Sequence, residues 1–514
     1  MLKAGRETSV SPANDAGTRT TSTGNHGLML EEPLLFERED WFGTGVDLPT
    51  PPAIVSRLGG LERVSPIGLP GLAEGEAVRH YTRLSRQNYA IDLGLFPLGS
   101  CTMKHNPRLN ERVARLPGFA DIHPLAPVAT VQGALELIAL VGDWLCKLTG
   151  MPAVSLSPKA GAHGELCGML AIRAAHDAAG NDGRGVVLVP ESAHGTNPAT
   201  AAFCGYAVEG IPATVDGRVD LATLEARLGP DVAAVMITNP NTCGLFERDM
   251  VAISEAVHAA GAFVYCDGAN FNAIVGRVRP GDLGIDAMHI NLHKTFSTPH
   301  GGGGPGAGPV VFSEALAPFA PLPFVDRRGD RFELVEEETA EDRHGESFGR
   351  MCAFHGQMGM FTRAAAYMLS HGADGLRQVS GDAVLNANYL LARLKGTLDA
   401  PFGDTGPCMH EALFSDEGLG DITTLDIAKG LIDEGFHPMT MYFPLVVHGA
   451  MLVEPTETET RAALDQFADA LLAVVERGKA DPAALKAAPH YAPRRRLDET
   501  LAARKPVLAW RAAE

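Results

Sequence analysis

Short apolar runs recur along the middle of the chain, and polar residues follow each of them directly. Residues 186–189 are followed by PESAHGTNPA, residues 233–237 by TNPNTCG, and residues 262–266 by DGANFNA. Between the last two runs, apolar residues recur with helical spacing from Met250 to Ala260. Strand and helix signals that alternate in this way predict βαβ units, and therefore an α/β fold built on a mostly parallel sheet.

The polar residues after these runs carry the candidate chemistry. The carboxyl ends of parallel strands meet at one edge of a sheet, and this is where open α/β sheets hold their ligands. His194 follows the first run, Asn241 and Thr242 follow the second, and Asp267 follows the third. We therefore expect these side chains at one edge of the sheet.

A further strand is predicted over residues 287–292, and it leads directly into His293 and Lys294. An aspartate and a lysine at one sheet edge suit pyridoxal phosphate chemistry, because the lysine forms a Schiff base with the cofactor. The acid keeps the pyridine nitrogen protonated, so that the ring can accept electrons. Asp267 and Lys294 are the candidates for these roles. The structural alternative is that Asp267 caps a turn through its DG dipeptide and Lys294 is a solvated lysine.

Length and composition limit the class of protein. A chain of 514 residues is longer than one core usually supports, so we expect two domains with extensions. The formal net charge of −19 opposes binding to nucleic acid and to anionic membranes, and no apolar run is long enough to span a membrane. The eight cysteines have no CxxC pair and no zinc-type spacing, so we predict reduced thiols, a cytoplasmic location and no metal site.

Changes of pattern along the chain predict its organisation. Residues 1–27 are rich in Ser, Thr, Gly and Asn and suit a disordered tail. Residues 28–125 are rich in proline and glycine, which favours an extended N-terminal arm of the kind that makes subunit contacts. The regular pattern over 126–375 predicts a large cofactor-binding domain. Helix and strand signals over 376–480 predict a smaller α/β domain, and 481–514 form a C-terminal extension.

Capping and charge patterns predict several local features of the second half. The capping box Thr456-x-x-Glu459 predicts the start of the last helix of the smaller domain, which is expected to stop at Gly478. A strand is expected near residues 439–447. The acidic stretch 333–346 is expected to be a surface loop.

A glycine-containing turn at Gly161–Gly164 opens a helix that is expected to run to about Ala179. Backbone amides at the start of a helix attract phosphate, helped by the helix dipole, so this turn is a candidate for the cofactor phosphate. Many glycines before helices only form turns, and that alternative stays open. The turn is not a Walker A loop, because no Lys-Ser or Lys-Thr follows it.

The phrases around these residues resemble a known family. HYTRLSRQNYAIDLGLFPLGSCTMKHNP at 80–107, NLHKTFSTPHGGGGPG at 291–306 and MYFPLVVHGAMLVEPTETE at 441–459 are similar to glycine dehydrogenase (decarboxylating). This family is the P-protein of the glycine cleavage system, and the length resembles subunit 2 of its divided form. Shorter phrases that also match are GAHGE (161–165), ESAHGTNPATA (191–201), DGANFNAI (267–274) and CMHE (408–411).

The resemblance implies a fold and a reaction. The fold is that of the fold type I pyridoxal phosphate transferases, with a large domain around a mostly parallel sheet of the seven-stranded type, a smaller C-terminal α/β domain and an N-terminal arm. The reaction is that of an oxidoreductase that uses pyridoxal 5'-phosphate to decarboxylate glycine, releases CO2 and transfers the aminomethyl group to the lipoyl group of H-protein. The implied partners are glycine, lipoylated H-protein and glycine dehydrogenase subunit 1, in a heterotetramer of two plus two.

Carried over residue by residue, the resemblance assigns Lys294 to the Schiff base and Asp267 to the pyridine nitrogen. His194 takes the place of the ring that stacks on the cofactor face, unless it is a turn histidine bonded to local backbone. His293 contacts the phosphate or acts as an acid, or else packs under the lysine. The glycine run 301–308 is expected to form part of the entrance for the lipoyl arm. The remaining cofactor-binding candidates are Gly161, Ala162 and His163 for the phosphate, and Asn241 or Thr242 with Asn270 for the ring oxygen.

The same sequence supports rival classes. His300 with the glycines after it resembles a lipase oxyanion loop, and GESFG at 345–349 matches the GxSxG nucleophile elbow. An elbow must follow a buried strand, and the acidic residues before this motif cannot form one. A scaffold that has lost its chemistry is disfavoured, because Lys294 and Asp267 are both present. Another amino-acid decarboxylase and an aminotransferase remain the alternatives within the cofactor class, and GSCTMK with MYFPLVVHGAMLVEPTETE favours the glycine enzyme by resemblance.

Overall fold

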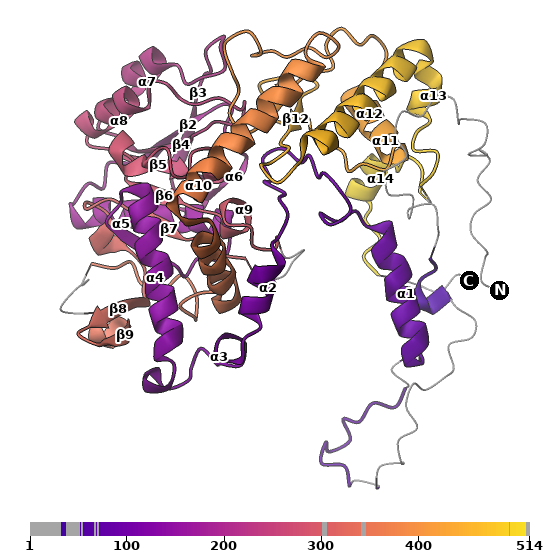
Figure 1. Cartoon of the computed structure of the whole chain (residues 1–514). Coiled ribbons are helices and arrows are strands. Elements are labelled where there is room, and N and C mark those ends of the chain that lie inside the picture. Colours follow the sequence, from indigo (N-terminus) through magenta and orange to yellow (C-terminus); the bar gives the residue numbers. More distant parts are fainter. Residues whose placement is uncertain are drawn as a thin grey trace.

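The computed structural model describes residues 32–37, 52, 55–65, 68, 71–300, 306–340, 346–492 and 494–509. The tail predicted over 1–27 lies outside these residues. The described part forms a large α/β unit and a smaller one, and helix α10 (Met358–Leu394) runs from the first to the second (Figure 1). None of the described helices is long and apolar enough to cross a membrane.

A seven-stranded sheet in the order β1-β7-β6-β5-β4-β2-β3 forms the centre of the large unit. Strand β7 is antiparallel to both of its neighbours, and the other neighbouring pairs are parallel. The expected mostly parallel sheet is therefore confirmed. The strands are β1 (Ala153–Ser155), β2 (Val186–Pro190), β3 (Ala207–Ile211), β4 (Val232–Thr238), β5 (Phe263–Asp267), β6 (Ala287–His289) and β7 (Val310–Phe312).

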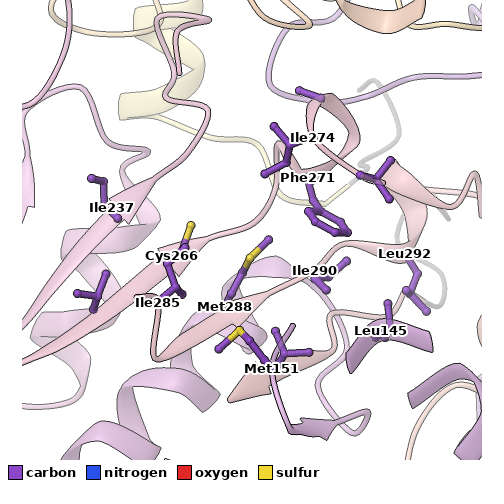
Figure 2. Close-up of a cluster of buried hydrophobic side chains, with 14 of the residues drawn as sticks. Leu145, Met151, Ile237, Cys266, Phe271, Ile274, Ile285, Met288, Ile290 and Leu292 are labelled. Atoms are coloured by element: carbon purple, nitrogen blue, oxygen red, sulfur yellow. The ribbon is translucent and has the colours of Figure 1, made fainter. Parts of the chain in front are cut away.

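Helices cover both faces of this sheet. Alternate residues of a strand point to opposite faces, so Tyr265 of β5 packs in the core beneath α5 (Gly161–Ala178), while Val264 and Cys266 pack in the core on the other face. Ile237, Cys266 and Met288 come from three neighbouring strands and share that second core with Leu145 (Figure 2). Because both faces are covered, the central strand β4 is buried along its whole length and reads as a continuous apolar run.

The helices that contribute to the core opposite α5 include α4 (Gln132–Thr149), α8 (Met250–Ala259) and the first part of α10. The other helices of the described N-terminal and central chain are α1 (Glu74–Gln87), α2 (Arg108–Ala114), α3 (Pro117–Ala120), α6 (Thr196–Phe203), α7 (Leu221–Arg227) and α9 (Leu292–Thr295).

The smaller unit has its own core around a three-stranded antiparallel sheet in the order β10-β12-β11. The second half of α10 enters this core beyond a kink at Gly372, and Leu95 of the N-terminal arm also packs into it. The domain boundaries remain predictions, and the boundary predicted after residue 375 falls inside α10. The elements are β10 (Ala412–Phe414), α11 (Thr424–Asp433), β11 (Thr440–Met441), β12 (Met451–Val453), α12 (Arg461–Ala480), α13 (Pro482–Lys486) and α14 (Glu499–Arg504).

The predicted start of the last helix of the smaller unit was wrong. Helix α12 begins at Arg461, and the side chain of Thr460 caps it by accepting the N–H of Ala463. Thr456 instead has a positive φ of 62°, and its hydroxyl lies 2.9 Å from that of Thr458. The Thr456-x-x-Glu459 pattern therefore belongs to a turn before the helix and not to its cap.

Two other local predictions were also partly wrong. The strand expected over 439–447 is limited to β11, because Tyr442 has a left-handed φ of 56° that ends the extended backbone. The acidic stretch 333–346 is not a loop at its start. Its first residues belong to β9 (Arg331–Val335), which pairs with β8 (Phe324–Arg328) in a hairpin.

Candidate active site

The carboxyl ends of four neighbouring strands, β6, β5, β4 and β2, meet at one edge of the sheet. His194 follows β2, Asn241 and Thr242 follow β4, Asp267 ends β5, and Lys294 follows β6. The structure thus brings the residues selected from the sequence to the same edge. Their individual environments differ, and these differences decide what each can do.

Lys294 lies in the single turn of helix α9, and its side chain is buried, with 8% of the residue exposed. The strand expected over 287–292 is shorter than predicted, because β6 ends at His289 and Leu292 already begins this helix. The Nζ of Lys294 donates a 2.7 Å hydrogen bond to the backbone carbonyl of Ser100. Lys294 is therefore not a solvated surface lysine.

Asp267 is buried and surrounded by groups that favour its ionised form. Its Oδ1 accepts the N–H of Ala269 at 2.9 Å and lies 3.3 Å from His289 Nε2, while Oδ2 accepts the Asn197 amide at 3.2 Å. Burial alone raises the pKa of a carboxyl group, but His289, the Ala269 amide, Lys294 and Asn197 together hold the pKa of Asp267 below its usual range. An ionised Asp267 can pair with a protonated pyridine nitrogen.

A second pair of residues orients this carboxylate. The hydroxyl of Tyr265 lies 2.7 Å from Nδ1 of His289, whose other ring nitrogen faces Asp267. At Gly268 an added Cβ would lie 1.9 Å from the His289 carbonyl, so only glycine fits this close approach of strands. Tyr265 and His289 were not among the site residues predicted from the sequence. Their signal was available, because both are polar residues inside otherwise apolar strands.

The first turn of α5, residues 161–163, forms a cradle at the same edge. An added Cβ at Gly161 would lie 3.1 Å from Asn291 Nδ2 and 3.2 Å from His289 Nε2, so a side chain there would fill the space. The buried Nζ of Lys159, just before the helix, has no hydrogen-bond partner among the described residues. Free backbone amides, the helix dipole and an unpaired ammonium group fit a phosphate group.

His293 is held between Asn291 and His300. Its Nε2 lies 3.0 Å from the Asn291 amide, its ring meets that of His300 edge-on, and its buried Nδ1 has no partner within the described part of the chain. Burial, followed by the charges of His300 and Lys294, lowers the pKa of His293 to about 3. The ring is therefore neutral and can offer one uncharged hydrogen bond to a ligand.

The three candidates for the cofactor's ring oxygen are engaged in loop structure. Asn241 accepts two backbone N–H groups of its own loop, and its amide donates to the Gly217 carbonyl and to Glu247. Thr242 donates to a backbone carbonyl after β2, and Asn270 donates to one after β4. The four bonds of Asn241 use its full hydrogen-bonding capacity, so its side chain has no bond left for the cofactor.

His194 combines features of both interpretations made from the sequence. It is exposed, and its Nδ1 lies 2.9 Å from the hydroxyl of Thr196, which is the local turn contact. Its ring also meets Phe443 of the smaller unit edge-on, with 5.5 Å between ring centres. The ring therefore lies at the edge of the sheet where the two units meet.

Residues 99–104 of the N-terminal arm form a wall of the site. The sequence had suggested only subunit contacts for this arm. Ser100 presents its carbonyl to Lys294, and its N–H donates to Glu411 at 2.8 Å. Gly99 approaches Leu452 of β12 so closely that an added Cβ would lie 2.6 Å from the Leu452 carbonyl oxygen. The arm therefore packs between Lys294 and the smaller unit.

Lys104 fixes the end of this wall beneath α9. Its buried Nζ donates to Asn272 at 2.9 Å, to the Thr295 carbonyl at 2.8 Å, to Tyr367 at 3.2 Å and to Glu457 at 2.7 Å. Burial lowers the pKa of a lysine, but the charge of Glu457 outweighs it and the pKa of Lys104 is raised. Lys104 is thus a buried cation bonded to the residue that follows Lys294.

Two features selected from the sequence are only partly tested by the structure. Residues 301–305 lie outside the described part of the chain. That the glycine run 301–308 forms part of the entrance for the lipoyl arm therefore remains a prediction. Of the GESFG motif, Ser347 lies in a loop, where its hydroxyl accepts the N–H of Gly349 at 3.2 Å. It does not lie at the strand-to-helix turn that a nucleophile elbow requires.

Comparison with known proteins gives relatives over nearly the whole chain. It is 67% identical over 517 residues to the probable glycine dehydrogenase (decarboxylating) subunit 2 of Caulobacter vibrioides, covering 99% of this chain and 98% of the relative. Relatives with the same name in Caldanaerobacter subterraneus (50% identical, 87% of this chain, 91% of the relative) and Listeria innocua (47%, 94% and 99%) are also similar. Residues 379–490 match the family described as glycine dehydrogenase, C-terminal domain, and residues 167–327 match aminotransferase class-V.

Solved structures resemble the chain in fold. A glycine decarboxylase (P-protein) of the glycine cleavage system, crystallised in an inhibitor-bound form, superposes with a TM-score of 0.68 at 22% identity, covering 81% of this chain and 93% of that one. The Oryza sativa TDC with PLP and tryptamine gives a TM-score of 0.61 at 13% identity, covering 81% and 90%. These likenesses confirm the expected fold type I architecture.

Proposed function

The chain belongs to the glycine dehydrogenase (decarboxylating) subunit 2 family, and from this premise we propose that it decarboxylates glycine with pyridoxal 5'-phosphate in the glycine cleavage system. One observation supports the assignment most directly. The buried amine of Lys294 and the ionised carboxylate of Asp267 lie at one edge of the sheet, close enough for their charges to interact. This is the pair of groups that the cofactor needs.

Bound pyridoxal phosphate supplies an electron sink, because its protonated ring takes up the electron pair left behind when a carboxylate departs. The residues of this chain prepare the site for that chemistry. Lys294 offers its amine as the covalent anchor, and the Ser100 carbonyl fixes the direction of that amine. Asp267 holds a proton on the ring nitrogen, and Tyr265 with His289 keeps its carboxylate in place.

The other candidates position the two ends of the cofactor. Residues 161–163 offer backbone amides to the phosphate, and Lys159 offers an ammonium group with no other partner among the described residues. His293 offers the phosphate a neutral ring nitrogen in addition to these groups. The exposed ring of His194 would stack on the cofactor face, and the loops that Thr242 and Asn270 hold would lie beside its ring oxygen.

The family name also suggests partners. We propose that the chain acts with glycine dehydrogenase subunit 1, in a heterotetramer of two plus two, in the cytoplasm. The aminomethyl group left after release of CO2 passes to the lipoyl group of H-protein, whose disulfide is the oxidant of the reaction. The exposed apolar side chains Leu109, Leu116 and Leu125 of the N-terminal arm are available for a subunit contact.

The test is exchange of labelled bicarbonate into the carboxyl group of glycine. The purified chain is loaded with pyridoxal phosphate and assayed with and without its subunit 1 partner. Exchange that needs glycine and is abolished in Lys294→Ala supports the proposal, and alanine in place of glycine is the substrate control. Exchange that persists in Lys294→Ala, or that the complete complex does not catalyse, would contradict it.

A further inference from the structure

A second group of polar side chains lies next to Lys294. His410 and Glu411 immediately precede strand β10, and Glu454 immediately follows strand β12. All three residues are completely buried, with 0% exposure. One nitrogen or oxygen atom of each lies within 4.8 Å of the others, and the charge of Lys294 acts on all three.

Most polar atoms of this group have no partner. Both ring nitrogens of His410, Oε1 of Glu411 and both carboxyl oxygens of Glu454 make no hydrogen bond within the described chain. The remaining oxygen, Oε2 of Glu411, accepts the N–H of Ser100. Unpaired polar atoms are costly to bury, and two buried carboxyl groups at this distance cannot both ionise. The group therefore holds a proton and offers several free atoms.

Burial and the surrounding charges place that proton on the two carboxyl groups and not on His410. Burial raises the pKa of Glu411 well above its usual range, and the charge of Glu454 raises it further. Burial also raises the pKa of Glu454 to about 7. Burial and the charge of Lys294 lower the pKa of His410 to about 3, so this ring is neutral. The other titratable groups that face the two carboxyls are Cys101, Cys243, Cys408, Lys104, Lys294 and Glu457.

We propose that Glu411 and Glu454 share one proton and supply it to the reaction beside Lys294. The proposal rests on the proposed function, because the balance of that reaction requires an acid. The bond between the glycine α-carbon and its carboxylate breaks, and the electron pair forms a bond from that carbon to one sulfur of the lipoyl disulfide. The sulfur–sulfur bond breaks, and the second sulfur takes a proton. The carbon is oxidised, the disulfide is reduced, and one proton is consumed.

The other titratable groups at this edge do not meet the requirement. Asp267 is ionised and committed to the ring nitrogen, and His293 and His410 have pKa values lowered to about 3, so they carry no acidic proton at neutral pH. Lys294 is the covalent anchor. Cys101 and Lys104 have raised pKa values and so hold their protons too tightly to give them up near neutral pH. Among the described residues of the site, the Glu411–Glu454 pair is thus the carboxylic acid with a proton to give. After giving it up, the pair takes another proton that comes from solvent.

The decisive variant is the double change Glu411→Gln with Glu454→Gln, which keeps the shape of both side chains and removes both carboxyl groups. Either single variant leaves one buried carboxyl that can keep the proton. Glycine–bicarbonate exchange forms no sulfur–hydrogen bond, so in the cofactor-loaded complex it should change less than about threefold. Transfer of the aminomethyl group to oxidised lipoamide should fall by at least about tenfold, and its pH dependence near neutrality should disappear. Glu459→Gln is the matched control, since burial also raises the pKa of Glu459 to about 7 but it lies outside the group.

A second measurement does not depend on activity. Without cofactor at neutral pH, the infrared carbonyl band of protonated carboxyl groups should lose the pair's contribution in the double variant. The single variants Glu411→Gln, which keeps an acceptor for the Ser100 N–H, and Glu454→Gln serve if the double variant does not fold, and each should shift the band because the remaining carboxyl keeps the proton. An unchanged band overturns the shared proton, and an unchanged ratio of transfer to exchange overturns its use. Absence of exchange in the wild-type complex would instead contradict the proposed function.

Discussion

Lys294 Nζ donates a 2.7 Å hydrogen bond to the carbonyl of Ser100, a residue 194 positions earlier in the chain. The reactive amine is therefore positioned by a backbone group of the N-terminal arm, and not only by the strand and helix that carry it. Since Ser100 also donates to Glu411, the same peptide segment connects the lysine to the acid pair. A change in this segment will move both.

Asp267→Asn should retain cofactor binding and lose most of the exchange activity. A neutral amide cannot stabilise a protonated pyridine ring, and removal of one preorganised electrostatic partner typically costs on the order of 10²-fold in rate. Absorbance of the bound cofactor measures the first effect and bicarbonate exchange measures the second. Asp267→Glu, which keeps the charge, should recover part of the activity. Unchanged turnover in Asp267→Asn would rule out the ring-nitrogen role.

Lys104→Met should destabilise the protein severely. It leaves Glu457 buried without its cation, and breaking a buried ion pair in this way costs about 3–5 kcal/mol. Urea denaturation of the chain measures the free energy of unfolding. The double variant Lys104→Met with Glu457→Gln should recover a large part of the loss, because no unpaired charge remains. A single-variant loss below about 1 kcal/mol would show that the contact is a weak one.

Glu454→Gln should change how stability depends on pH. In the folded protein the pKa of Glu454 is raised from the ordinary 4.5 to about 7, so folding is favoured when the group is protonated. This stabilisation is complete below the unfolded pKa and is lost as the pH rises through 7. Between these limits the wild type should lose roughly 3 kcal/mol relative to the variant. Parallel denaturation curves of the two proteins at all pH values would contradict the raised pKa.

Substitutions at His194 distinguish its two interpretations. If the ring stacks on the cofactor, His194→Ala should weaken cofactor binding by about tenfold, whereas His194→Phe should retain it. Thr196→Val removes the local partner of Nδ1 and should have little effect. Absorbance titration with pyridoxal phosphate gives the three affinities. The turn interpretation is correct instead if Thr196→Val weakens binding as much as His194→Ala does.

The sequence predicted those parts of the site that depend on local pattern. An acid after a buried strand and a lysine after the next strand identified Asp267 and Lys294, and the helix start at Gly161 was placed correctly. The same rule applies to Glu454, which directly follows β12, but that strand was not predicted. It has only three residues, and its neighbours Ala450 and Gly449 gave no periodic signal.

The contributions of the N-terminal arm could not be predicted from pattern. Residues 99–104 form neither helix nor strand, and their partners lie several hundred positions away, so no local periodicity marks them. His289 shows a different limit. The sequence pattern placed it in an apolar run. Its hydrogen bond with Tyr265 and its approach to Asp267 arise because β5 and β6 are adjacent in the sheet. Pairing between strands decides such contacts.

The wall formed by residues 99–104 has a consequence for biosynthesis. Ser100 leaves the ribosome early, but its acceptor Glu411 is made 311 residues later, and the partner of Lys104, Glu457, follows it by 353 residues. The large sheet is complete in sequence before either partner exists. Contacts so distant in sequence form late in folding. A nascent or truncated chain that ends before Glu411 can thus hold Lys294 on a finished sheet while the wall beside its amine still lacks its partners in the smaller unit.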